Sequence, residues 1–134
     1  MTAASAEPCD KLPLQTVRPL RGIEREALRV WAARRGHVLV EVELTGSAGK
    51  PELLAAIARA FRFPAWFGMN LDALYDSLTD LPAPEGGGGY VVLLDGLAHA
   101  AGFNAQQRAA LLDVFRDAGE RFAERSIPFR VLYR

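Results

Sequence analysis

The spacing of apolar residues predicts a helix and then a strand in the first third of the chain. Between residues 22 and 35 apolar side chains recur at helical spacing, and arginines lie opposite them. The apolar positions are Ile23, Ala27, Val30 and Trp31. Gly36 stands where a glycine commonly ends a helix. Residues 37–44 form a β-branched run in which Glu41 and Glu43 alternate with apolar residues, a pattern typical of a strand.

Two further helices and a well-covered strand are expected between residues 51 and 94. Pro51 can occupy the first turn of a helix, whose buried stripe consists of Leu53, Leu54, Ile57, Ala58 and Phe61. Pro64 prevents this helix from continuing, and Asn70 can cap a new helix that runs to about Leu81. After a loop rich in proline and glycine, residues 90–94 are continuously apolar, as in strands covered on both faces.

The last part of the chain predicts a long helix and a final strand. Asn104 and Gln107 have the spacing of a capping box at a helix start, and residues 128–133 read as extended. Because helices separate the strands and no hairpin signal occurs, the pattern predicts parallel pairing and an α/β fold. Residues 1–20 contain three prolines and no sustained periodicity, so we expect a loose or partly docked extension with little function.

Composition limits the chain to one hydrophobic core in a reducing compartment. Of its 134 residues, 50% are hydrophobic, which suits a single domain. Cys9 is the only cysteine, so neither a disulfide nor a thiolate metal site can form within the chain. No apolar run is long enough to cross a membrane, and the N-terminus lacks the pattern of a signal peptide. A cytoplasmic protein is expected.

The distribution of charge points to a positively charged partner. Sixteen basic residues balance sixteen acidic ones, and the zero net charge argues against a dedicated nucleic-acid-binding protein. Residues 63–107, however, contain no Lys or Arg. Their acidic residues are Asp72, Asp76, Asp80, Glu85 and Asp95. A segment with this excess of negative charge attracts cationic partners and repels phosphate groups.

The predicted helix after Asn70 combines an acidic side with an apolar side. At 100° per residue, Asp72, Asp76 and Asp80 lie together, opposite a leucine stripe. The acidic pair at spacing i,i+4 is mildly repulsive, so helix stability does not explain it. A solvated surface is the simplest interpretation. Aromatic residues around the stripe instead favour an interface, with Trp66 expected to be more exposed than Phe67 and Tyr75 beside the aspartates.

The segment FPAWFGMNLDALYDSLTDL resembles the aromatic loop and second helix of the barstar family, small intracellular inhibitors of bacterial ribonucleases. The similarity continues more weakly in VLVEVELTG upstream and VFRDA downstream. It covers residues 37–134 and implies a three-stranded parallel sheet flanked by helices. Residues 1–36 would then be an N-terminal extension carrying one additional amphipathic helix.

The resemblance also implies a binding site for a basic, barnase-like bacterial ribonuclease or a related toxin. Family inhibitors place this helix and its preceding loop in the nuclease active site, where carboxylates occupy the positions of RNA phosphates. By motif this role falls first to Asp76 and then to Asp72. The implied flanking contacts are Trp66, Gly68, Asn70, Tyr75, Thr79 and Asp117. Met69 and Arg121 stand where the family carries acids, which should weaken pairing with the most basic nucleases.

Other functions have less support from the sequence. An aspartate pair that faces solvent stays ionised, whereas a general acid must hold a proton. We therefore expect no catalytic residue. His37 and His99 lack a nucleophile motif nearby, and no cluster predicts a metal or cofactor site. The glycine run lacks the Lys-Ser or Lys-Thr of a phosphate loop. One alternative stays open, a binding module of the same scaffold directed at a different basic protein or toxin.

Overall fold

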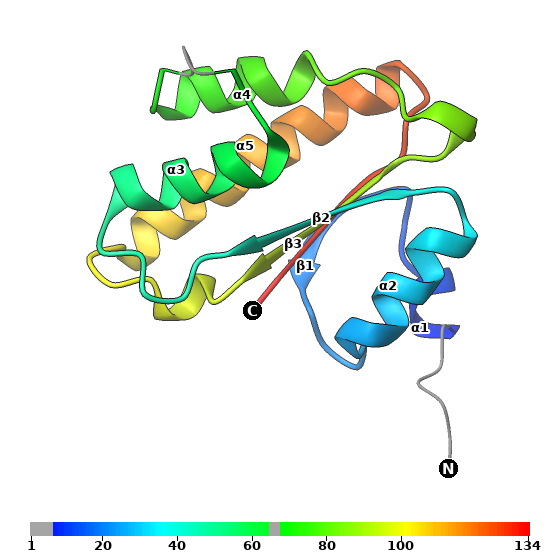
Figure 1. The fold of residues 1–134 in the computed structure, drawn as a ribbon, viewed down its shortest axis with the longest axis horizontal. Coiled ribbons are helices and arrows are strands. Elements are labelled where there is room, and N and C mark those ends of the chain that lie inside the picture. The colour runs from blue at the N-terminus through cyan, green and yellow to red at the C-terminus, as the bar shows by residue number, and fades with distance from the viewer. Residues whose placement is uncertain (1–6, 65–67) are drawn as a thin grey trace.

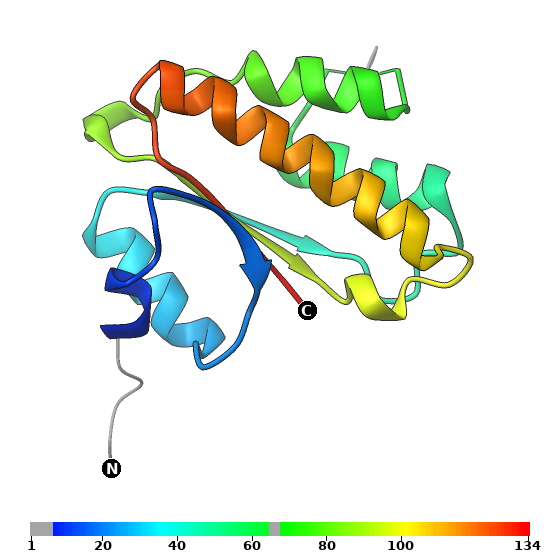
Figure 2. The same cartoon turned by 180° about the vertical axis from the view of Figure 1, so that it is seen from behind.

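The computed structural model describes residues 7–64 and 68–134, which form three layers (Figure 1). Helices α3 (Lys50–Phe61), α4 (Leu71–Thr79) and α5 (Ala105–Glu124) cover one face of a central sheet. Helices α1 (Glu7–Asp10) and α2 (Arg25–Arg34) cover the other face, as the reverse view shows (Figure 2). Two short 3-10 turns, η1 (Glu85–Gly87) and η2 (Leu97–His99), flank the third strand. No helix among the described residues is long and apolar enough to span a membrane.

The sheet contains four parallel strands rather than the three we expected. They are β1 (Gln15–Pro19), β2 (Val38–Glu43), β3 (Tyr90–Asp95) and β4 (Phe129–Tyr133), arranged in the order β1-β4-β3-β2. Val131 of β4 lies opposite Val17 of β1 on one side and Val92 of β3 on the other. The additional strand comes from the segment that we expected to be a loose or partly docked extension, and its regular pairing with β4 was not predicted. Pro19 is tolerated there because it ends an edge strand.

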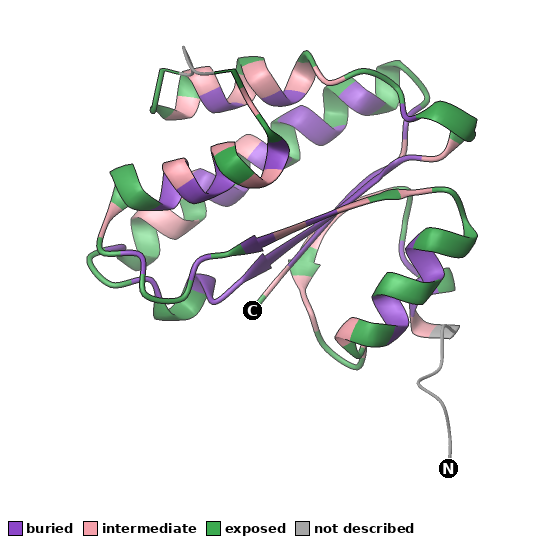
Figure 3. Cartoon of the chain, in the orientation of Figure 1, coloured by how far each residue is buried: buried purple, intermediate pink, exposed green. Residues whose placement is uncertain are grey.

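Alternation along the strands creates a separate core on each face of the sheet. Val92 and Leu94 of β3 face the larger core under α3, α4 and α5, which also contains Phe115, Phe122 and Phe129. Val91 and Leu93 face the smaller core under α1 and α2, with Leu28 and Trp31. Every residue of β3 is buried, which confirms the prediction of a strand covered on both sides (Figure 3).

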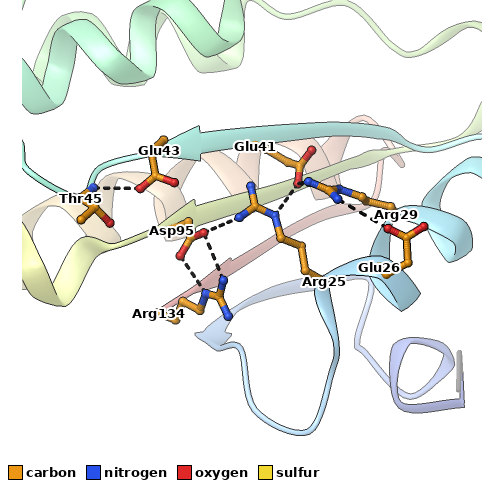
Figure 4. A network of polar contacts seen from close by, with 8 residues as sticks. All are labelled: Arg25, Glu26, Arg29, Glu41, Glu43, Thr45, Asp95 and Arg134. Carbon is orange, nitrogen blue, oxygen red and sulfur yellow. Dashed lines mark hydrogen bonds and ion pairs between the residues drawn. The ribbon is translucent and has the colours of Figure 1, made fainter. Parts of the chain in front are cut away.

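The N-terminal segment is tied to the rest of the chain by apolar packing and by polar contacts. Cys9 is completely buried, and the indole nitrogen of Trp31 donates a hydrogen bond to Asp10 at 2.9 Å. Arg25 of α2 contacts both Glu41 on β2 and Asp95 at the end of β3 (Figure 4). Arg134 binds the same Asp95 carboxylate at 2.7 Å. These hydrogen bonds from Arg134 and Arg25 hold the pKa of Asp95 below its ordinary value.

His37 joins the N-terminal segment to β2 and lies partly buried between charged and aromatic groups. Its Nδ1 accepts a hydrogen bond from the backbone N–H of Gly89 at 2.9 Å, and its ring lies 5.0 Å from that of Trp31. Burial lowers the pKa of His37, and the positive charges of Arg130 and Arg35 lower it further. At neutral pH the side chain is therefore an uncharged hydrogen-bond acceptor.

Candidate functional site

Helix α4 begins where the sequence predicted, with Asn70 as its N-cap. The Asn70 side chain accepts a hydrogen bond from the backbone N–H of Ala73 at 2.7 Å and donates one to the carbonyl oxygen of Gly68 at 3.1 Å. The two bonds fix the start of the helix relative to the residue that ends the aromatic loop. Met69, between them, adopts a left-handed conformation and is 41% exposed. Trp66 and Phe67 lie outside the described residues.

Packing of the leucines determines which side of α4 faces solvent. Leu74 and Leu78 are completely buried in the larger core, whereas Asp72 and Asp76 are exposed. Tyr75 is half-buried and packs against the same core. The predicted division into an acidic side and an apolar side is therefore confirmed.

The C-terminal end of α4 is held by α5. The guanidinium of Arg125, just after α5, donates hydrogen bonds to the carbonyl oxygens of Thr79 at 3.3 Å and Leu81 at 3.1 Å. The Thr79 hydroxyl donates to the carbonyl oxygens of Tyr75 and Asp76 within its own helix. α4 has no basic residue in its last turn, so Arg125 supplies the positive charge that stabilises this end of the helix dipole.

An open groove runs between α4 and α5 and is lined by acids from both helices. Leu71, Asp72, Tyr75 and Asp76 line it from α4, and Val114, Asp117, Glu120, Arg121 and Glu124 line it from α5. We call this the acidic groove. The structure thus brings Asp117 to the same surface as Asp72, Tyr75 and Asp76.

Two of these acids, Glu120 and Glu124, were not among the predicted site residues. They follow Asp117 at helical spacing, and this spacing was the signal that could have found them. Arg121, which stands where the family carries an acid, forms an ion pair with Glu124 at 2.6 Å. The other four acids, Asp72, Asp76, Asp117 and Glu120, form no ion pair with any residue in the described part of the chain, so the groove stays strongly anionic despite Arg121.

Asp76 borders a second hollow on the other side of α4. Gly68, Ala73, Ser77 and Asp80 line that hollow together with residues from the end of α3. Gly68 therefore shares this second hollow with Asp76, outside the acidic groove, whereas Asn70 lines neither hollow. Asp76 lines both hollows and forms the ridge between them, with Asp72, Tyr75 and Asp117 on one side and Gly68 on the other.

Neither histidine lines the acidic groove. Within residues 7–64 and 68–134, no three His, Cys, Asp or Glu side chains converge to hold a metal ion. His37 lies in the opposite layer, and His99 is exposed after β3. The groove offers fixed negative charge at a partly apolar surface, which suits recognition of a cationic partner.

Comparison with known protein families gives a match over most of the chain. A protein-family model described as Barstar (barnase inhibitor) matches residues 37–134, which include α4, α5 and the whole acidic groove. The match begins after α2, so β1 and α2 lie outside it. No curated protein matches the chain.

Proposed function

Because the chain belongs to the Barstar (barnase inhibitor) family, a family of inhibitors rather than enzymes, we propose that it binds and inhibits a basic microbial ribonuclease. The observation that carries the proposal is the position of Asp76 on the ridge between two hollows. One hollow contributes Asp72, Tyr75 and Asp117, and the other contributes Gly68. The proposed contact surface is centred on this residue.

The physical basis is electrostatic imitation of the substrate. A ribonuclease active site must hold several cationic groups to bind a polyanion. The carboxylates of Asp72 and Asp76 project from one side of a helix whose two ends are fixed by Asn70 and Arg125. Charge-assisted hydrogen bonds from arginine to such carboxylates are strong, and rigid placement reduces the entropy lost on binding. Inhibition would then require no chemistry from this protein.

Arg121 affects which charge distribution on a partner would match this surface. Its ion pair with Glu124 reduces the negative charge at one end of the acidic groove, while Asp117 and Glu120 stay available. We expect the nuclease to place its most basic residues against α4 and a less basic rim against the end of α5.

The test is a titration of the full chain against a panel of basic bacterial ribonucleases, with RNA cleavage measured for each. One-to-one binding that blocks cleavage supports the proposal. A second candidate, a binding module of this scaffold for a different basic protein, is supported by the same anionic groove. Binding to a basic toxin without ribonuclease activity, and to none of the nucleases, would favour that candidate.

A further inference from the structure

A second groove lies at the carboxyl ends of β1 and β4, away from the acidic groove. Its apolar surface comes from Leu20 after β1, Leu97 after β3, Leu112 on α5 and Tyr133 on β4. Its basic residues are Arg21, Arg108 and Arg134. We call it the switch-point groove, for the reason that follows.

The strand order creates this groove. After β1 the chain leaves for the face covered by α2, whereas after β3 it leaves for the face covered by α5, and β4 lies between these two strands (Figures 1 and 2). Connections that depart to opposite faces leave a crevice outside the carboxyl ends of the strands. In open α/β sheets this is the usual place for a ligand. Because β1 forms one side, the groove depends on a strand that lies outside the family match.

The size of the groove suits a small molecule. Its volume is about 500 Å³. Ligand pockets commonly enclose about 300 to 1,000 Å³ and combine an apolar lining with a few polar groups that orient the ligand. The aliphatic and aromatic surface of Leu20, Leu112 and Tyr133 can cover the apolar body of such a ligand.

Charge identifies the head group that fits. Arg134 is neutralised by Asp95, with which it forms an ion pair at 2.7 Å. Arg108 donates to the uncharged carbonyl oxygen of Phe103 at 2.8 Å and forms no ion pair with a described residue, so no described carboxylate side chain compensates its positive charge. Arg21 is exposed and forms no hydrogen bond or ion pair with the described part of the chain. None of the described residues that line the groove has a carboxylate side chain.

We propose that the switch-point groove binds a small amphiphilic anion, with a carboxylate or phosphate group between Arg21 and Arg108 and an apolar body over Leu20, Leu112 and Tyr133. Guanidinium groups bind both head groups through paired hydrogen bonds. The groove contacts the first half of α5, up to Leu112, and the acidic groove contacts the second half from Val114. The two sites do not overlap, so this proposal does not depend on nuclease inhibition.

Calorimetric titration of the full chain with octanoate and with octyl phosphate tests the proposal. Both probes carry an eight-carbon chain, and 1-octanol and octylamine are the matched neutral and cationic controls. We expect one site for an anionic probe and at least about tenfold weaker binding of both controls. Binding of only one of the two anions also supports the proposal and identifies the head group.

Three variants locate the site. Arg21→Gln and Arg108→Gln should each weaken anion binding by about tenfold, whereas Arg34→Gln, an exposed position on α2, should leave it unchanged. Ala109 is exposed and lines the groove, so Ala109→Trp should block it without altering charge. The absence of binding by either anion, equal binding of octylamine, or undiminished binding by Ala109→Trp would overturn the proposal.

Discussion

Asp76 on α4 and Asp117 on α5 line one groove, although strand β3 lies between the two helices in the chain. Their proximity depends on the larger core, where Leu74 and Leu78 of α4 are completely buried together with Leu111 and Phe115 of α5. The proposed contact surface is thus a product of tertiary packing, and an isolated α4 peptide would lack half of it.

Arg121→Glu should increase the association rate with a basic ribonuclease several-fold at low salt. The change replaces a cation with an anion in the acidic groove, and steering by complementary charge acts mainly on the association rate. Stopped-flow measurement at two salt concentrations checks this. Asp113→Asn, on a side of α5 that does not line the groove, should change the rate little. A slower association of Arg121→Glu would contradict the assigned role of the groove.

Arg125→Met should destabilise the protein by about 1 to 2 kcal/mol. The variant loses the hydrogen bonds to the carbonyl oxygens of Thr79 and Leu81 and leaves the end of α4 without a nearby cation. Urea unfolding measures the difference in free energy. Arg116→Met is the control and should cost under about 0.5 kcal/mol, because within residues 7–64 and 68–134 its side chain forms an ion pair only with Asp113 on the same helix. Equal losses for the two variants would argue against the Arg125 contact.

Trp31→Ala should destabilise the protein by about 3 to 5 kcal/mol. The side chain is 3% exposed, packs in the smaller core and donates a hydrogen bond to Asp10, so the variant would leave a cavity and remove this bond, although Arg35 would still pair with the Asp10 carboxylate. Val30→Ala, at a neighbouring position that is 39% exposed, should have little effect. If Trp31→Ala were as mild as Val30→Ala, the N-terminal segment would be only loosely attached to the sheet.

Acidification from pH 6.5 should lower the free energy of unfolding through His37. Its folded-state pKa lies below the unfolded value of about 6.5, so the unfolded state takes up the proton first. The contribution of His37 to the free energy of unfolding is complete above pH 6.5, and it is lost as the pH falls toward the folded-state pKa. Asp95, whose pKa is lowered from 3.8, adds a separate loss only below that value.

Urea unfolding at pH 7 and pH 5 measures this loss. His37→Gln should reduce the difference between the two pH values, because glutamine keeps an acceptor for the Gly89 N–H without titrating. His99→Gln, at an exposed position, should behave like the wild type. An unchanged pH dependence in His37→Gln would exclude His37 as its origin.

Sequence patterns predicted the elements whose signals are local. Asn70 and Gln107 both make the capping contacts expected of them, and the continuous apolar run of β3 is buried as predicted. Strand β1 was missed because Pro13 and Pro19 surround a short segment whose pairing partner, β4, is remote in the chain. Its stability comes from tertiary contacts that periodicity does not encode.

The site was predicted in part for the same reason. Asp72 and Asp76 occupy one side of a helix that the sequence specifies, so their common exposure could be predicted. The contribution of Glu120 and Glu124 depends on how α5 is rotated against α4, which only packing decides. The motif therefore did not show that Glu120 and Glu124 offset the positive charge that Arg121 brings to the acidic groove.

The most direct test of the account is titration of the wild type and Asp76→Asn against a ribonuclease that the protein inhibits. Loss of one partner of a buried interfacial charge pair costs about 2 to 5 kcal/mol, a range for which the barnase–barstar complex is itself a source. We expect Asp76→Asn to weaken binding by an amount in this range and to restore RNA cleavage, with Asp113→Asn unchanged. Equal affinity of Asp76→Asn and the wild type would contradict the central role of the α4 acids.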